Sequence, residues 1–141
     1  MENKAIIEGV LQEFAGLAKH PRKSYHEKAV SDYIVSRLAA LGITAKQDGV
    51  YNVIADIPAT PGYEAAPVTM LQGHMDMVCE KRPNVEHDFT KDGLNLSVEG
   101  DYVSANGTTL GGDDGIAVAY GLALLESDTI AHPPLEVFIT V

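Results

Sequence analysis

The sequence of 141 residues contains one cysteine, Cys79, and no long apolar run. A single cysteine excludes an internal disulfide, so we expect a reducing compartment. No apolar stretch approaches the roughly 20 residues that a helix needs to cross a bilayer, so no membrane partner is expected. The start, Met1 to Lys4, lacks the basic and then apolar pattern of a secretory signal. These absences predict a cytoplasmic protein.

Basic residues are also few, since 10 Lys and Arg stand against 20 Asp and Glu and the formal net charge is -10. Binding to nucleic acid needs clustered cations that release counterions. Only Lys19, Arg22, Lys23 and Lys28 lie close together along the chain. We therefore expect no nucleic-acid partner. The acidic balance is typical of an ordinary soluble protein, and carboxylates gathered to bind cations are the alternative.

The apolar content, at 45% hydrophobic residues, is sufficient for a folded core. We find no internal repeat and no low-complexity segment, so residues 1–141 are expected to form one unit. Apolar residues at helical spacing predict a first helix from about residue 6 that ends near residues 19–20, before Pro21. Residues 116–125 are apolar nearly all round, which predicts a buried helix.

A second helix is predicted by a start signal. Ser24 and Glu27 fit the capping box, in which the serine side chain binds the amide three residues on and the glutamate returns to the amide of the cap. An apolar stripe follows from Val30 to Leu41, and Gly42 is the expected stop.

Short strand-like segments are residues 43–47, 50–57, 68–72, 97–99, 102–104 and 135–141. The turn residues Asp48–Gly49 and Gly100–Asp101 predict hairpins. Residues 68–72 and 135–141 are apolar runs of the buried-strand type. Strands separated by helices predict an α/β fold, a layered mixed β-sheet flanked by helices.

The last strand, residues 135–141, stops while still apolar and without a turn residue. We expect the chain to be truncated at this point. An open strand of this kind is a candidate for self-pairing with a second copy.

The first candidate site is Gly73-His74-Met75-Asp76, which directly follows the strand 68–72. In an extended backbone residues i and i+2 share a side, so His74 and Asp76 should lie on one face at the carboxyl end of the strand. Open α/β sheets place their sites at that end. Neutral imidazole is the commonest metal ligand, and a neighbouring carboxylate orients it. The pattern is short, and a solvated loop pair is the alternative.

The second candidate site is Gly111-Gly112-Asp113-Asp114-Gly115, at the start of the predicted buried helix. An aspartate here could be a simple helix cap, because its charge suits the positive end of the helix dipole. Two carboxylates framed by glycines are more than a cap requires. A carboxylate held at a helix start offers two oxygens that could bridge two cations.

Other polar residues are weaker candidates. We expect His26 to be a surface helical residue, and His20 and His132 to be exposed in turns. His87 and Asp88 lie in a polar loop, where a substrate contact and a plain surface pair are both open. Cys79 lacks the signature of an activated nucleophile. Residues 107–110 could contact the site through their backbone or could be a linker.

Three stretches resemble one known family. Residues Leu71–Lys81 followed by His87–Phe89, together with Gly107–Gly115, are similar to the aminoacyl-histidine (Xaa-His) dipeptidases. Residues Pro21–Ser31 resemble the N-terminal pattern of the same family. Its superfamily of co-catalytic zinc exopeptidases also includes carboxypeptidase G, the tripeptidases and acetylornithine deacetylase.

The resemblance implies a zinc-exopeptidase-like catalytic domain and a role for each matched residue. His74 would bind one zinc, Asp113 would bridge two, and Asp76 would be the catalytic-site carboxylate that supports His74. A water between the cations would attack the peptide carbonyl of a dipeptide while a glutamate acts as general base. Mn²⁺ or Co²⁺ could replace Zn²⁺, and the parent protein would be a homodimer.

The resemblance also implies that residues 1–141 are only the N-terminal part of that domain. The family's Glu-Glu pair would follow the strand 135–141, and further ligands and a dimerisation domain would come later. Glu136 lies too early to replace that pair. We therefore expect this chain alone to bind zinc poorly and to be inactive. The alternatives are a related di-zinc aminopeptidase or tripeptidase, and a non-catalytic truncated product.

Overall fold

The structure is a computed structural model that describes residues 2–141. Met1, the first residue of the segment that was predicted not to be a secretory signal, lies outside the described residues. Along the chain the elements are α1 (Glu2–Ala18), α2 (Lys28–Ala40), β1 (Lys46–Gln47), β2 (Val53–Ile57), β3 (Thr69–His74), β4 (Leu96–Glu99), β5 (Tyr102–Ala105), α3 (Gly112–Glu126) and β6 (Leu135–Thr140). Within residues 2–141 no helix combines the length and the apolar character that crossing a membrane requires.

Four strands form the main sheet in the order β1-β2-β6-β3, and β4 and β5 form a separate hairpin. Strand β6 pairs antiparallel with β2 and parallel with β3. Its alternate residues Leu135, Val137 and Ile139 are buried, as the two-residue period of a strand requires. The parallel register sets His74 of β3 opposite Thr140 of β6, so both strands end at the same edge of the sheet.

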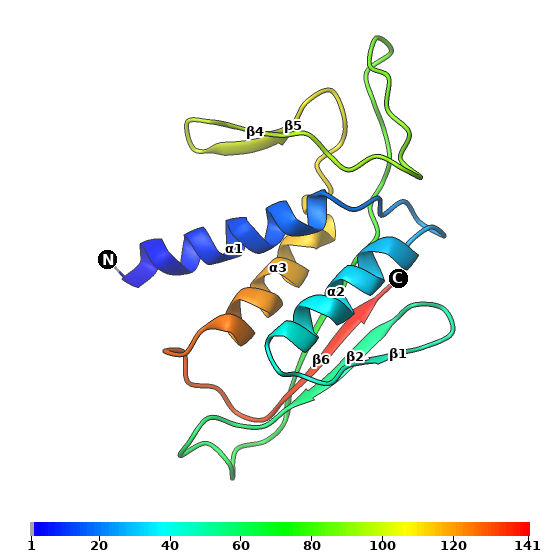
Figure 1. The fold of residues 1–141 in the computed structure, drawn as a ribbon. Coiled ribbons are helices and arrows are strands. Elements are labelled where there is room, and N and C mark those ends of the chain that lie inside the picture. The colour runs from blue at the N-terminus through cyan, green and yellow to red at the C-terminus, as the bar shows by residue number, and fades with distance from the viewer. Residues whose placement is uncertain (1) are drawn as a thin grey trace.

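The three helices cover one face of the main sheet (Figure 1). Alternate residues of β2 and β6 are buried, while the residues between them keep some exposure. The buried helical side chains of the shared core are Val10, Phe14, Leu17, Val30, Ile34, Leu38, Val118 and Leu122. Helices α2 and α3 contact the sheet directly, and α1 packs mainly on α3. The predicted α/β fold with a layered mixed sheet is confirmed, with its helices on a single face.

The predicted hairpins form, with a difference at the first turn. Strands β4 and β5 pair around Gly100, which has a φ of 61°. Strands β1 and β2 also pair, but their connection is the five-residue segment 48–52 rather than a two-residue turn. The carboxylate of Asp48 binds the amides of Val50 and Asn52 and holds this longer loop. Gly42, with a φ of 76°, ends the second helix as expected.

The capping-box prediction for the second helix is wrong. Helix α2 begins at Lys28, and Glu27 holds the cap position without a side-chain cap hydrogen bond. Glu27 instead accepts the backbone N–H of Tyr25 at 2.6 Å, and the Ser24 hydroxyl donates to Asp76. Tyr25 has a positive φ of 68°, which reverses the chain before the helix. A contact with a distant residue therefore outweighed the local motif.

The prediction that residues 135–141 form an open strand is also wrong, because β6 has a neighbour on each side. The unpaired edge on that side of the sheet belongs to β3, which was expected to be buried. Met70 of β3 is 54% exposed. An apolar hollow of about 890 Å³ runs beside this edge, lined by parts of α1, α3 and β3.

Helix α3 forms where predicted but is buried on one face only. Val118, Ala119 and Leu122 are buried against the sheet and α1, whereas Tyr120 is 59% exposed. Tyr120 lines the hollow beside β3. The helix is apolar nearly all round, but the sheet and α1 cover only part of it, because within residues 2–141 β3 pairs on one side only.

Candidate metal centre

The candidate site lies where β3 ends and α3 begins. His74 is the last residue of β3, and Gly73 before it packs against the first turns of α3. A Cβ atom added to Gly73 would lie 3.1 Å from both Ala117 Cβ and Asp114 Oδ2. Glycine at this position therefore lets the start of α3 approach the end of β3 closely.

The segments next to the site also pair with each other. The Thr109 amide donates to the Glu80 carbonyl at 2.9 Å, and the Arg82 amide donates to the Gly107 carbonyl at 2.9 Å. Residues 107–110, which could have been a linker, thus make backbone contacts beside the site. These contacts bring the loop that follows His74 against the segment that leads to α3.

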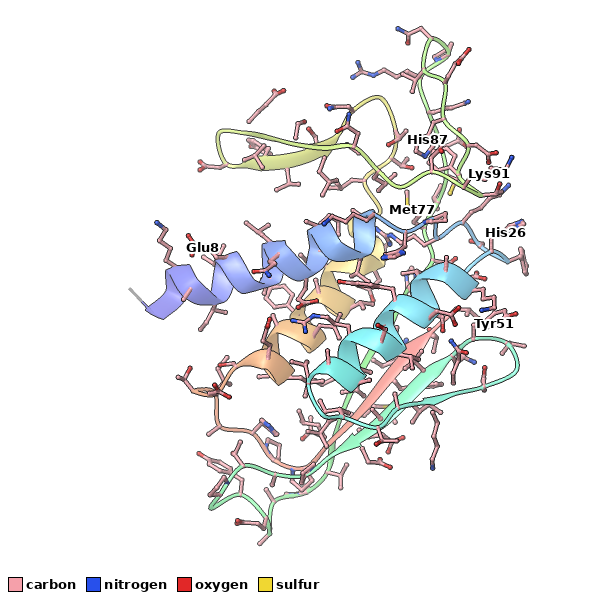
Figure 2. All side chains as sticks on the ribbon, in the orientation of Figure 1. Glu8, His26, Tyr51, Met77, His87 and Lys91 are labelled. Atoms are coloured by element: carbon pink, nitrogen blue, oxygen red, sulfur yellow. The ribbon has the colours of Figure 1, made fainter. Side chains whose placement is uncertain are left out.

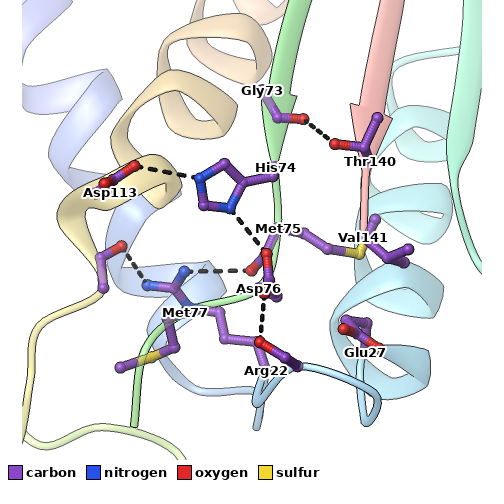
Figure 3. A network of polar contacts seen from close by, with 12 residues as sticks. Arg22, Glu27, Gly73, His74, Met75, Asp76, Met77, Asp113, Thr140 and Val141 are labelled. Atoms are coloured by element: carbon purple, nitrogen blue, oxygen red, sulfur yellow. Dashed lines mark hydrogen bonds and ion pairs between the residues drawn. The ribbon is translucent and has the colours of Figure 1, made fainter. Parts of the chain in front are cut away.

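The imidazole of His74 lies between two carboxylates (Figure 3). Its Nδ1 is 2.8 Å from Asp76 Oδ1, and its Nε2 is 3.2 Å from Asp113 Oδ1. The Asp113 side chain is 95% exposed, so this end of the site faces solvent. The structure thus brings together the three predicted site residues. Their roles as metal ligands and supporting carboxylate stay predictions.

The two carboxylates affect the protonation of His74. Partial burial lowers its pKa, but the hydrogen bonds to Asp76 and Asp113 and the charges of Asp76 and Asp114 outweigh burial, so the pKa lies above its usual value. The neighbouring carboxylates therefore favour a positive charge at the imidazole. A cation that binds Nε2 replaces the proton there, because a metal-binding histidine must be neutral.

Asp76 is held by a residue that the sequence predicts to cap the second helix. Its Oδ2 accepts a hydrogen bond from the Ser24 hydroxyl, while Oδ1 faces His74. Both oxygens are therefore used, which fixes the orientation of the carboxylate. In the sequence, Ser24 stood out only because it matches a capping box, and a capping box pairs Ser24 with Glu27 rather than with Asp76.

We expect Ser24→Ala to lower the free energy of unfolding by about 1 to 3 kcal/mol, because a half-buried carboxylate loses a hydrogen bond. Urea denaturation measures this change. Ser97→Ala is the matched control, since the Ser97 hydroxyl bonds only within the exposed segment around the β4–β5 hairpin. Equal losses of unfolding free energy in the two variants would contradict a stabilising role for the hydrogen bond between Ser24 and Asp76.

Asp113 and Asp114 lie in the first turn of α3 but do not cap it. Gly111 occupies the cap position, with a φ of 67°. Both aspartates have non-helical backbone angles, and the peptide bond between them is cis. Among the described residues no side-chain cap hydrogen bond forms at this helix start. Asp113 reaches His74, as described above, while Asp114 turns toward Gly73.

Among residues 2–141, no hydrogen bond or ion pair joins the other histidines or the cysteine to His74. Figure 2 shows His26, which is exposed, on the loop before α2 rather than on the helix. His87 packs edge-on against Phe89, with ring centroids 4.4 Å apart. His20 stacks on Tyr33. Burial raises the pKa of the Cys79 thiol, which is opposite to the activation of a nucleophile.

Across residues 2–141 no group of three or more His, Cys, Asp or Glu side chains is arranged to hold a metal ion. A zinc ion usually has three or four protein ligands. His74 and Asp113 are therefore too few to form a complete site by themselves.

Comparison with known proteins gives two strong similarities. The chain is 41% identical over 128 residues to the cytosol non-specific dipeptidase of Escherichia coli (strain K12), a match that covers 91% of this chain and 26% of that protein. Its structure matches an aminoacylhistidine dipeptidase from Vibrio alginolyticus with a TM-score of 0.90 and 41% identity, over 94% of this chain and 27% of the other.

A third similarity concerns the fold alone. A tripeptidase from Staphylococcus aureus matches with a TM-score of 0.75 and 23% identity, over 95% of this chain and 36% of that chain. No family model matches the sequence. The chain spans about a quarter of the length of the two dipeptidases. Over that stretch its sequence is 41% identical to both dipeptidases, and its fold matches the corresponding part of the aminoacylhistidine dipeptidase.

Proposed function

We propose that this chain is part of a metal-dependent dipeptidase that hydrolyses dipeptides of the Xaa-His type; we call the complete enzyme the parent protein. The observation that most supports this function is the pairing of His74 Nε2 with Asp113 Oδ1, 3.2 Å apart, beside a supporting Asp76. The 41% identity to two dipeptidases, against 23% to the tripeptidase, favours dipeptides over tripeptides.

The residues present fit one part of a zinc site. An imidazole nitrogen and a carboxylate oxygen are ligands that zinc prefers, and both face the same small volume. The exposure of Asp113 leaves its second oxygen free for another cation. In this proposal the remaining ligands and the glutamate base come from the part of the parent protein outside these 141 residues. We expect the 141-residue chain alone to bind zinc weakly and to be inactive.

Each residue of the site has one task in the proposed reaction. In the proposed site Asp76 accepts a hydrogen bond from the Nδ1–H of His74, which leaves the Nε2 lone pair available to a metal ion. Asp113 would hold zinc through its carboxylate. Two bound zinc ions would lower the pKa of a water molecule and polarise the peptide carbonyl. The solvent-facing side of Asp113 leaves room for the dipeptide to approach.

We extend the proposal to the cofactor, assembly and location of the parent protein. Two Zn²⁺ ions are the proposed cofactors, with Mn²⁺ or Co²⁺ as substitutes. The parent protein is proposed to be a homodimer without nucleic-acid or membrane partners. A cytoplasmic location is supported by the single cysteine and by the cytosolic relative.

The test is His74→Ala in the parent protein. We expect zinc affinity, measured by calorimetric titration, to fall by more than the roughly 10- to 100-fold that loss of a supporting residue causes. Hydrolysis of Xaa-His dipeptides should become undetectable. Asp113→Asn is expected to have a similar effect, because the amide lacks the charge and the second anionic oxygen.

The matched control is His26→Ala, which removes an exposed imidazole from a loop. It should leave zinc affinity and hydrolysis unchanged. Full activity of His74→Ala would rule out the proposed function, and so would a wild-type parent protein that binds no divalent cation. Turnover by the purified 141-residue chain at ordinary enzyme rates would contradict the incomplete site. Preference for tripeptides would support the related tripeptidase instead.

A further inference from the structure

Arg22 is a buried cation without a carboxylate partner among the described residues. It is 2% exposed and lies in the loop between α1 and α2. Burial lowers its pKa, and only Asp76 and Cys79 oppose this shift from a distance. Its nearest aromatic contact is Phe14, with the ring centroid 6.0 Å from Cζ. A buried charge is costly unless hydrogen bonds compensate it, so the partners of Arg22 require an explanation.

The partners of the guanidinium are backbone carbonyls on the two segments that carry the candidate site. Nη1 donates to the Met75 carbonyl at 3.3 Å, between His74 and Asp76. Nη2 donates to the Gly111 carbonyl at 2.7 Å and to the Leu110 carbonyl at 3.3 Å, just before Asp113. One planar group therefore connects the end of β3 with the start of α3 (Figure 3).

The backbone near Arg22 is shaped around the guanidinium. A Cβ atom added to Gly111 would lie 2.3 Å from Nη2, and one added to Gly115 would lie 2.9 Å from it. Gly111 also has a φ of 67°, which side-chain-bearing residues rarely adopt. The Met77 amide donates to the Arg22 carbonyl at 3.0 Å, so the main chain of Arg22 is tied to the loop after β3 as well.

We propose that Arg22 is a positioning residue of the metal centre, and that its guanidinium sets the separation of His74 and Asp113 by binding the backbone next to each. This inference rests on the function proposed above. Gly73 also packs against Ala117 and Asp114 of α3, but this packing is apolar or close-range, whereas the guanidinium hydrogen-bonds to the backbone of both segments. Lysine does not replace this group, because an ammonium lacks the planar fork that reaches two segments at once.

The test compares Arg22→Lys with Arg37→Lys in the parent protein. Arg37 is a second arginine with partly buried contacts, but it joins helices and does not touch the site. Hydrogen exchange by mass spectrometry, without metal, reports on peptides that contain Met77 and Gly115, whose amides donate to Arg22 and Gly111. We expect exchange there to be about tenfold faster in Arg22→Lys and unchanged in Arg37→Lys.

Zinc titration supplies the second readout, well below the melting temperatures of both variants. We expect Arg22→Lys to raise the zinc dissociation constant by about 10- to 100-fold, and Arg37→Lys to leave it unchanged. Equal exchange and equal zinc affinity in the two variants would overturn the inference. If the wild type bound no zinc, the proposed function would fail, and the exchange comparison would still decide whether Arg22 holds the two segments together.

Discussion

Replacement of Arg37 by methionine is expected to lower the free energy of unfolding by about 3 kcal/mol, because it leaves a buried carboxylate without its partner. Glu13 of α1 is 2% exposed. Its Oε1 accepts hydrogen bonds from Arg37 Nε at 2.8 Å and Nη2 at 2.6 Å. Its Oε2 has no hydrogen-bond partner in the part of the chain that the structure describes. Urea denaturation measures the loss.

The position of Arg37 explains the expected size of this effect. Its Nη2 also lies 2.7 Å from Glu126 Oε1, so one guanidinium on α2 connects to α1 and α3. These hydrogen bonds hold the pKa of Arg37 above its usual value. The double variant Glu13→Leu with Arg37→Met should recover most of the loss, because apolar groups can replace a buried ion pair.

An exposed ion pair is the control for Arg37. Lys28 and Asp32 form an i,i+4 pair on the surface of α2. Lys28→Met should change stability little, because solvent screens such pairs. A similar loss of unfolding free energy in Lys28→Met and Arg37→Met would contradict the claim that burial makes the Arg37–Glu13 pair important. The same conclusion would follow if the double variant Glu13→Leu with Arg37→Met were less stable than Arg37→Met alone.

Leu17→Ala is expected to lower the free energy of unfolding by about 2 to 5 kcal/mol, because it leaves a cavity in the core. Leu17 is 1% exposed and packs within the single cluster formed by the three helices and the sheet. Thermal and urea unfolding both report the change. Helix α1 carries a matched position, Leu11, which is 40% exposed.

Leu11→Ala should cost well under half as much as Leu17→Ala, because a partly exposed side chain buries less apolar surface. Alanine has a high helix propensity at both positions, so the difference reports packing alone. Comparable losses in the two variants would mean that Leu17 of α1 does not pack in the core as described.

The elements of the fold were predictable where their cause is local. The two-residue period of residues 135–140 and the turn at Gly100 depend on neighbours in the chain, and both are observed. The capping box at Ser24 has the same local character but failed, because Asp76 offers the hydroxyl a partner 52 residues away. Both β3 and β6 are apolar runs in the sequence, so this pattern could not predict that β6 is a central strand and β3 an edge strand.

The candidate site was predictable only in part. His74, Asp76 and Asp113 were found by their chemistry and by a family resemblance, and they do lie together. Arg22 was considered only as one of four basic residues that lie close together along the chain, and as part of the stretch Pro21–Ser31. Its side-chain partners lie 53 to 89 residues further along the chain, and no pattern near Pro21 indicates them.

The sequence by itself determined which segments become helices and strands and which side chains are able to bind a cation. Periodicity and side-chain chemistry depend on a few consecutive residues, so a linear reading is sufficient for both. The tertiary structure decided that β3 is the open edge, that Ser24 serves Asp76 and that Arg22 joins two segments. Each of these depends on which distant segments meet, since burial and hydrogen-bond partners exist only after the chain has packed.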